Sequence, residues 1–151
     1  MRVSIFGMGY VGSVTAACLI KQGHAVIGVE VADSKIEELK NGIWPIYEPG
    51  LDELNSPEII KSHFIATKDE EKALSESEVS LICVGTPGTV NGTVELKYLQ
   101  TVLSHIRDFL IKNKKNHVVL IRSTIPPGTT GKIIFSNFKE IGSDVKIGFL
   151  P

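Results

Sequence analysis

Short apolar runs alternate along this chain with segments whose apolar residues recur every three or four positions. A continuous apolar run bounded by turn residues is typical of a strand covered on both faces. Such runs predict strands over Val3–Phe6, Ala25–Val29, Phe64–Ala66, Val79–Val84, His117–Ile121 and Val145–Phe149. The segments between them predict helices over Tyr10–Gln22, Asp33–Asn41, Leu51–Asn55, Asp69–Leu74, Leu96–Lys112 and Thr129–Asn137, of which Leu96–Lys112 has the clearest apolar period. Because strands and helices alternate, we expect an α/β fold built on a doubly wound, mainly parallel sheet.

The first two helices and the loop after them carry more specific expectations. The first helix is apolar on most sides, which predicts that it is buried. Asp33 is placed to cap the second helix, and Gly42 is placed to end it. The segment after Gly42 is too apolar for a plain linker, so Trp44 and Tyr47 are expected to pack against the protein.

The first strand runs directly into a glycine pattern, Gly7-x-Gly9-x-x-Gly12, that opens the first helix. Gly7 permits the tight turn from strand to helix, Gly9 lets the backbone approach a pyrophosphate, and Gly12 lets the helix pack close to the strand. The N–H groups of the first helical turn would then face the phosphates, with the positive end of the helix dipole behind them. Taken alone the pattern is weak, because glycine-rich turns are common.

An acidic residue at the end of the second strand strengthens this interpretation. Glu30 directly follows Ala25–Val29, at the spacing of roughly 20 residues where a carboxylate binds the adenosine ribose. Lys35 lies in the first turn of the next helix, where the dipole disfavours a cation. It is either a solvated lysine or a cation placed beside Glu30 and the adenosine end of the cofactor. Strand, glycine turn, helix and carboxylate together predict a dinucleotide-binding site of the Rossmann type.

Two later strands also end in small or hydroxylated residues. Gly85-Thr86 follows Val79–Val84, and Ser123-Thr124 follows the strand that ends at Ile121. In doubly wound sheets, ligands bind beyond the carboxyl ends of the strands. We therefore expect these residues to share one site with the glycine turn and Glu30.

Composition and charge exclude several classes of protein. A chain of 151 residues, 42% hydrophobic and 22% charged, suits one ordinary globular domain with a sizeable core. The net charge of −1 is spread over mixed acidic and basic residues, so no footprint for nucleic acid or an anionic membrane is visible. The start has no signal-peptide pattern and the longest apolar run is far too short to span a membrane, so a cytoplasmic location is expected.

Cysteines and histidines give no sign of a metal site, because none of them form a cluster with metal-ligand spacing. Cys18 and Cys83 lie in apolar segments and are expected to be buried and unpaired. The four histidines are scattered and are expected at the surface or at strand edges.

Five motifs occur in a fixed order along the chain. They are F-G-M-G-Y-V-G over Phe6–Gly12, G-V-E over Gly28–Glu30 with Lys35, Y-E-P-G-L over Tyr47–Leu51, I-C-V-G-T-P over Ile82–Pro87 and R-S-T-I-P-P-G-T over Arg122–Thr129. In these motifs the chain resembles the N-terminal domain of the UDP-glucose/GDP-mannose dehydrogenases, over essentially its whole length. The set is far more specific than a generic glycine fingerprint.

The resemblance implies an NAD-dependent, four-electron oxidation. The primary alcohol of a sugar nucleotide would be converted to a carboxylate through an aldehyde and a cysteine thioester, with two NAD reduced. It also implies cofactor contacts at Tyr10, Val11, Glu30, Lys35, Thr86 and Thr124. Thr124 would lie near the nicotinamide and help to hold the catalytic water. Arg122 and the Asn-Gly loop after Thr86 look more like the GDP-mannose than the UDP-glucose members.

Three departures from the family pattern affect this reading. Glu30 stands where the family usually has Asp, and Leu150 stands where it has Asn. In the family this Asn is followed by Pro-Glu-Phe, and the sequence stops at Pro151, before that glutamate. The resemblance then implies that the nucleophilic cysteine, the catalytic lysine and asparagine, the sugar-nucleotide domain and the dimerising helix lie outside these residues. Cys83 is not expected to replace that nucleophile, because a thiolate is disfavoured inside a buried strand.

We therefore interpret residues 1–151 as the NAD-binding Rossmann domain of a longer nucleotide-sugar dehydrogenase, with the substrate domain absent. The full-length enzyme would oxidise GDP-mannose or UDP-glucose in polysaccharide biosynthesis and form a homo-oligomer, with the sugar nucleotide bound through the missing half. This chain alone is expected to bind NAD and to be inactive. The expected cofactor-binding residues are Gly7, Gly9, Tyr10, Val11, Gly12, Glu30, Lys35, Thr86 and Thr124, with only a supporting catalytic role for Thr124 and no metal.

Two alternative functions remain open at this point. The first is a stand-alone NAD-binding module that regulates a partner and has no chemistry of its own. The second is another NAD-dependent hydroxy-acid dehydrogenase, although the E-P-G-L and S-T-I-P-P-G-T motifs argue against it.

Overall fold

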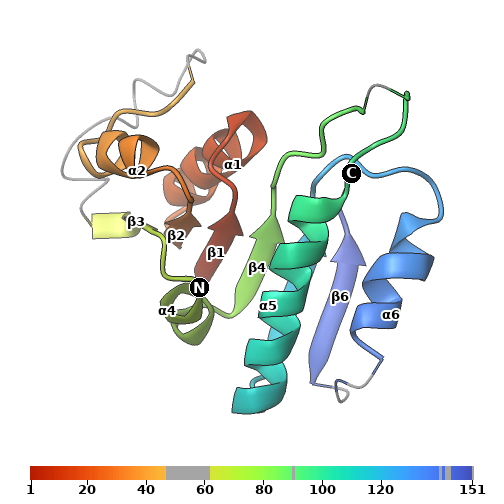
Figure 1. Cartoon of the computed structure of the whole chain (residues 1–151). Coiled ribbons are helices and arrows are strands. Elements are labelled where there is room, and N and C mark those ends of the chain that lie inside the picture. The colour runs from red at the N-terminus through yellow and green to blue at the C-terminus, as the bar shows by residue number, and fades with distance from the viewer. Residues whose placement is uncertain (47–61, 90, 140, 142–143, 151) are drawn as a thin grey trace.

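A computed structural model of the chain describes residues 1–46, 62–89, 91–139, 141 and 144–150. Its sheet has six strands in the order β3-β2-β1-β4-β5-β6, and every pair of neighbours is parallel (Figure 1). The strands are β1 (Arg2–Phe6), β2 (Ala25–Val29), β3 (Phe64–Thr67), β4 (Val79–Ile82), β5 (His117–Ile121) and β6 (Val145–Phe149). The predicted doubly wound sheet is confirmed, and it is wholly parallel among the residues described.

Helices connect these strands in the predicted order. They are α1 (Tyr10–Lys21), α2 (Asp33–Lys40), α4 (Glu70–Glu76), α5 (Lys97–Asn113) and α6 (Phe135–Asn137). A π-helical segment, η2 (Thr130–Ile134), precedes α6, so the last predicted helix is one mixed helical segment. The predicted helix over Leu51–Asn55 and the side chain of Tyr47 lie outside the described residues. No helix in the described part of the chain is long and apolar enough to cross a membrane.

Alternate residues of the strands supply two hydrophobic clusters on the two faces of the sheet. Ile5 packs in the cluster that includes residues of α1 and α2, whereas the adjacent Phe6 packs in the cluster that includes α4 and α5. Figure 1 shows α5 in front of the sheet, between β4 and β6. Each large side chain that becomes fully buried in such a cluster contributes roughly 1.5–3 kcal/mol of transfer free energy. The helices are held to the sheet chiefly by this burial.

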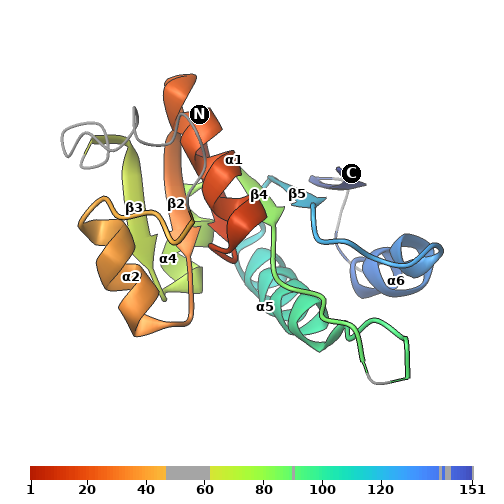
Figure 2. The ribbon, with the colours of Figure 1, turned by 90° about the horizontal axis from the view of Figure 1, so that it is seen from above.

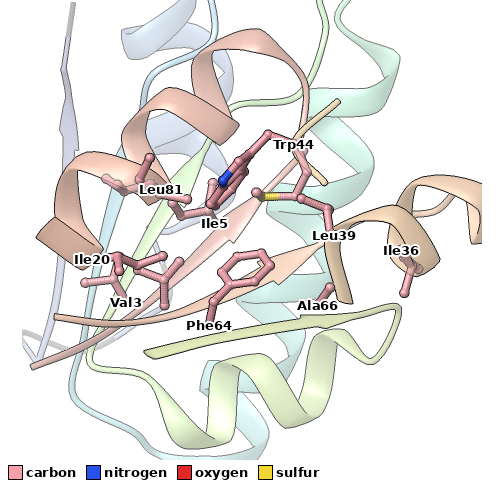
Figure 3. Close-up of a cluster of buried hydrophobic side chains, with 13 residues drawn as sticks. Val3, Ile5, Ile20, Ile36, Leu39, Trp44, Phe64, Ala66 and Leu81 are labelled. Atoms are coloured by element: carbon pink, nitrogen blue, oxygen red, sulfur yellow. The ribbon is translucent and has the colours of Figure 1, made fainter. Parts of the chain in front are cut away.

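The loop after α2 is anchored by Trp44. This side chain is buried, and its ring centroid lies 5.3 Å from that of Phe64 at an interplanar angle of 52°. Figure 3 shows Trp44, Phe64 and Leu39 together in the α1/α2 cluster. The prediction that Trp44 packs against the protein is therefore confirmed.

Two expectations for α1 and α2 are wrong in detail. The N-cap of α2 is Ala32, with Asp33 as the first helical residue, and no side chain caps this end. α1 is buried along one side only, so Val11 and Cys18 are exposed. A helix that packs on a single sheet buries only the stripe that faces it, and here small residues such as Ala16 and Ala17 form that stripe. Cys18 is therefore a surface thiol and not a core residue.

A chain of buried polar side chains lies toward the amino ends of the central strands. Ser4 Oγ of β1 lies 2.7 Å from Ser80 Oγ of β4, and Ser80 Oγ lies 2.7 Å from His117 Nε2 of β5. Ser77 Oγ lies 3.0 Å from Ser4 Oγ and donates to the Ala73 carbonyl at 2.7 Å. His117 is only 2% exposed, which corrects the expectation that every histidine lies at the surface or at a strand edge.

The order of the strands places an opening at the opposite edge of the sheet. β1 lies between β2 and β4, so the chain leaves the carboxyl end of β1 toward one side and that of β4 toward the other. Loops that diverge in this way leave a crevice, which is where doubly wound sheets bind ligands. Figure 2 views the molecule from above, with α1, β4 and α5 gathered near its centre.

Candidate functional site

The crevice holds a cavity of about 580 Å³ at the carboxyl ends of the strands. It is lined by Phe6, Gly7, Gly9, Tyr10, Val11, Val29, Glu30, Val31, Lys35, Glu70, Cys83, Val84, Gly85, Thr86, Tyr98, Thr101, Val102, Arg122, Ser123 and Thr124. Every residue predicted to bind the cofactor is in this lining except Gly12. The structure thus brings together strand ends that are far apart in the sequence.

The three glycines of the turn have three different surroundings. Gly7 adopts φ +94°, and a Cβ there would lie 2.9 Å from the Cys83 carbonyl oxygen. A Cβ on Gly12 would lie 2.0 Å from the Gly7 carbonyl oxygen, so any side chain would push α1 off the turn. Gly9 has no atom within 4 Å of an added Cβ and lines the cavity. Gly7 and Gly12 are therefore required by the fold, whereas the space beside Gly9 is open to a ligand.

The Glu30 carboxylate joins the glycine turn to the end of β2. Its Oε1 accepts hydrogen bonds from the Val31 and Ala32 N–H groups at 2.8 and 3.2 Å, and its Oε2 accepts one from the Met8 N–H at 3.3 Å. Lys35 Nζ lies 3.8 Å from Glu30 Oε2. Lys35 was expected to be either a solvated lysine or a cation beside Glu30, and the structure places it beside Glu30. Glu30 is 8% exposed, and the backbone donors and Lys35 hold its carboxylate in one orientation at the cavity wall.

The loops after β4 and β5 are tied together on the other side of the cavity. Thr86 Oγ1 donates to the Thr124 carbonyl at 2.6 Å, and Ser123 Oγ donates to the Val84 carbonyl at 2.7 Å. Ser123 is buried, and its hydroxyl is used in this hydrogen bond to the backbone. Thr124 is exposed, and its hydroxyl makes no hydrogen bond to another described residue. Of the predicted residues, Thr124 offers a hydroxyl to a ligand at this end.

Cys83 lines the cavity, but its thiol is protonated at neutral pH. Burial raises the pKa of Cys83 to about 11, and the opposing effect of the Arg122 guanidinium is smaller. A neutral thiol is a poor nucleophile. The expectation that Cys83 is buried inside a strand is wrong, because it follows β4 and is half-buried at the cavity wall. Its raised pKa still argues against Cys83 as a catalytic residue.

Four cavity residues come from helices that sequence reasoning did not connect to the site. Glu70 is the first residue of α4, and Tyr98, Thr101 and Val102 lie on α5. The apolar period of Leu96–Lys112 predicted a helix, but it did not indicate which of its residues would reach the cavity. Met8 was also missed as a structural residue: it is fully buried, and its Sδ lies 2.8 Å from where a Gly28 Cβ would be. Within the described residues, no group of three or more His, Cys, Asp or Glu could hold a metal ion.

Comparison with known proteins assigns this arrangement to one family. A family model described as "UDP-glucose/GDP-mannose dehydrogenase family, NAD binding domain" matches residues 1–151. The chain is 41% identical to GDP-mannose 6-dehydrogenase of Pseudomonas aeruginosa, over 100% of the chain and 36% of that protein. It is 36% identical to a UDP-glucose 6-dehydrogenase of Bacillus subtilis, over 89% of the chain and 28% of that protein.

Solved structures give the same result. A ternary complex of GDP-mannose dehydrogenase from Pseudomonas aeruginosa superposes with a TM-score of 0.91 at 40% identity, covering 99% of this chain and 35% of that one. A UDP-glucose dehydrogenase from Pyrobaculum islandicum has a TM-score of 0.84 at 31% identity, covering 98% and 34%. The chain thus spans about a third of the length of each of these relatives.

Proposed function

Because the chain belongs to the UDP-glucose/GDP-mannose dehydrogenase family and matches its NAD-binding domain, we propose that the cavity described above is the site where NAD binds. The observation that carries the proposal is the open space at Gly9, beside the first turn of α1 and within the same cavity as Glu30 and Thr124. Backbone N–H groups at a helix N-terminus are suited to a pyrophosphate. A dinucleotide laid across the carboxyl edge of the sheet would then reach from Glu30 to Thr124.

Each end of this cavity suits one part of the dinucleotide. Glu30 would accept hydrogen bonds from the hydroxyls of the adenosine ribose, with Lys35 keeping the carboxylate oriented. Tyr10 and Val11 would cover the pyrophosphate from the first turn of α1. Thr86 and Thr124 would lie at the nicotinamide end, where Thr124 would help to hold the catalytic water. NAD, when bound, supplies a hydride acceptor.

We further propose that the full-length protein is a nucleotide-sugar dehydrogenase of polysaccharide biosynthesis. It would oxidise the primary alcohol of GDP-mannose or UDP-glucose to a carboxylate with two NAD. The higher identity to the GDP-mannose enzyme, 41% against 36% for the UDP-glucose enzyme, favours GDP-mannose. Arg122 and the Asn-Gly loop after Thr86 favour it too. We also propose that the protein is cytoplasmic and homo-oligomeric. The net charge of −1, from acidic and basic residues mixed along the sequence, supports a protein that does not bind nucleic acid or anionic membranes.

A two-stage measurement on the 151-residue chain tests the proposal. Calorimetric titration with NAD is expected to show saturable binding at one site per chain. NADH absorbance is then followed after addition of GDP-mannose or UDP-glucose, and no sustained increase is expected, because the cavity offers no ionised thiol. Absence of NAD binding would contradict the assigned site. Sugar-dependent NADH production would show that these residues hold a complete active site.

A further inference from the structure

We propose that Glu70 selects the adenine base of the dinucleotide by accepting a hydrogen bond from its exocyclic 6-amino group. The proposal rests on the NAD site proposed above and adds one specificity residue to it. Glu70 is far from the glycine turn in the sequence, and no motif of the chain includes it. It nevertheless lines the same cavity as Glu30 and Lys35.

The register of the sheet places Glu70 at the adenosine end of the cavity. Val29 of β2 pairs with Thr67 of β3, so the residues that follow these two strands leave the sheet side by side. Glu30 directly follows β2, and its N–H donates to the Thr67 carbonyl at 3.1 Å. Glu70 begins α4 three residues after Thr67. A base attached to a ribose held by Glu30 would therefore lie near the Glu70 side chain.

The start of α4 is fixed by its own contacts. Asp69 caps the helix, because its Oδ1 accepts a hydrogen bond from the Lys72 N–H at 2.8 Å. Lys68 Nζ pairs with Asp33 Oδ1 of α2 at 2.6 Å, which links this turn to the helix after Glu30. The backbone that carries Glu70 is thus attached to the same helix as Lys35.

His105 of α5 holds the Glu70 carboxylate in one orientation. His105 Nδ1 lies 2.8 Å from Glu70 Oε2, and Glu70 Oε1 makes no hydrogen bond with the other residues that the structure describes. Thr101 lies one helical turn before His105 on the same face of α5 and lines the cavity, as does Val102. Glu70 and His105 also line a second cavity of about 300 Å³, so Glu70 borders both cavities.

This surrounding matches the chemistry of adenine. The apolar side chains of Val31 and Val102 suit the flat faces of a purine, and a carboxylate oxygen suits a donor at its edge. Adenine presents an amino group at position 6, whereas hypoxanthine presents a carbonyl oxygen there. A carbonyl oxygen facing the Glu70 carboxylate would be repelled, and neither acceptor would be paired.

The experiment compares NAD with nicotinamide hypoxanthine dinucleotide, which differs only in the 6-substituent of the base and its ring N1. Calorimetric titration of the wild-type chain is expected to give a Kd for the hypoxanthine analogue that is about 10-fold higher or more, the size of effect seen when a partly buried polar group loses its partner. In Glu70→Ala the two Kd values are expected to converge to within about 3-fold, chiefly through weaker NAD binding.

Glu71→Ala is the matched control, because Glu71 is an exposed carboxylate on the same helical turn that lines only the second cavity. It removes the same charge and is expected to keep the wild-type preference. Equal affinity of the wild-type chain for the two dinucleotides would overturn the proposal, and so would a preference that survives in Glu70→Ala. Glu70→Gln, whose amide can accept from an amino group or donate to a carbonyl, gives the same test if Glu70→Ala fails to fold, and its two Kd values are also expected to converge. If neither dinucleotide binds, the NAD site itself is wrong and the proposal for Glu70 falls with it.

Discussion

The two edges of the sheet use polar residues in opposite ways. At the carboxyl edge, Gly9 faces open space and the Thr124 hydroxyl is exposed beside a cavity of about 580 Å³. Toward the amino edge, Ser4, Ser80 and His117 are buried and hydrogen-bonded to one another. Strand order explains the open carboxyl edge, because the loops after β1 and β4 diverge there. The Ser4 and Ser80 hydroxyls and His117 Nε2 bond within the cluster, so their polarity alone does not indicate a ligand site, although His117 Nδ1 has no hydrogen-bond partner among the described residues.

A lysine near the buried Ser4, Ser80 and His117 side chains binds the carboxyl end of α4. Lys115 Nζ donates to the carbonyls of Leu74, Ser75 and Ser77 at 2.5, 2.6 and 2.7 Å, at the carboxyl end of α4. Carbonyls at a helix C-terminus lack partners within the helix, and a cation there also interacts favourably with the dipole. This contrast predicts that substitutions at ligand-facing positions of the carboxyl edge change the affinity for NAD. Substitutions at the amino edge are expected to change the free energy of unfolding instead.

The largest effect is expected from Gly9→Val. The side chain would occupy the space of the pyrophosphate, so the Kd for NAD is expected to rise by at least about 1000-fold, or ~4 kcal/mol, with the melting temperature nearly unchanged. Calorimetric titration and thermal unfolding measure the two quantities. Gly88→Val is the control, because Gly88 also has open space around it but does not line the cavity. Normal NAD binding by Gly9→Val would show that Gly9 is only a turn residue.

The next effect is a loss of stability in acid that originates at the amino edge. Burial, and to a lesser extent Lys115, lowers the pKa of His117 from 6.5 to about 4. The unfolded chain then takes up the proton at higher pH than the folded one. The free energy of unfolding therefore keeps its full value above pH 6.5. It falls as the pH drops from 6.5 to about 4, by at most ~3 kcal/mol from this residue.

Denaturant unfolding at several pH values measures this dependence. His117→Leu is expected to flatten the curve between pH 6.5 and 4, whereas the control His24→Leu is expected to keep the wild-type slope. The NAD affinity of His117→Leu at pH 7 is expected to match that of the wild type. An unchanged slope in His117→Leu would mean that His117 does not titrate differently in the folded protein.

A smaller effect is expected in the choice between dinucleotides. The 2′-phosphate of NADP would meet the Glu30 carboxylate, and Lys35 is the only cation in the cavity lining near it. NAD is therefore expected to bind about 30-fold more tightly than NADP, or ~2 kcal/mol, and Glu30→Gln is expected to narrow the ratio. Competition titration measures both ratios. Equal affinity for NAD and NADP in the wild type would contradict the role given to Glu30.

The smallest effect is expected at Lys115. Lys115→Met keeps most of the aliphatic stem but removes the donor to the last carbonyls of α4, so the free energy of unfolding is expected to fall by about 1 kcal/mol. The NAD affinity is expected to stay within about 2-fold of the wild type, a difference of ~0.4 kcal/mol. Lys112→Met, at an exposed position near the end of α5, is the control. A large loss of NAD affinity in Lys115→Met would show that the two edges are coupled.

Some features of this protein follow from the sequence alone. The alternation of apolar runs and amphipathic segments predicted the parallel sheet, and the glycine spacing with Glu30 predicted which strand ends share a cavity. These patterns are readable because they arise from local causes. The period of side chains in a strand or helix is fixed by backbone geometry, and only glycine fits φ +94° at Gly7 and the close approach at Gly12.

Other features were decided only by the tertiary structure. Local periodicity says that a face is apolar, but it does not say what covers that face. The sequence therefore placed Cys18 in the core and His117 at the surface or a strand edge, and the packed structure reverses both. Glu70 and Thr101 join the cavity because two separate crossovers, β3 to β4 and β4 to β5, place α4 and α5 on the same face of the sheet. Such contacts join residues far apart in the chain, so they depend on how the layers stack and leave no mark in the local pattern.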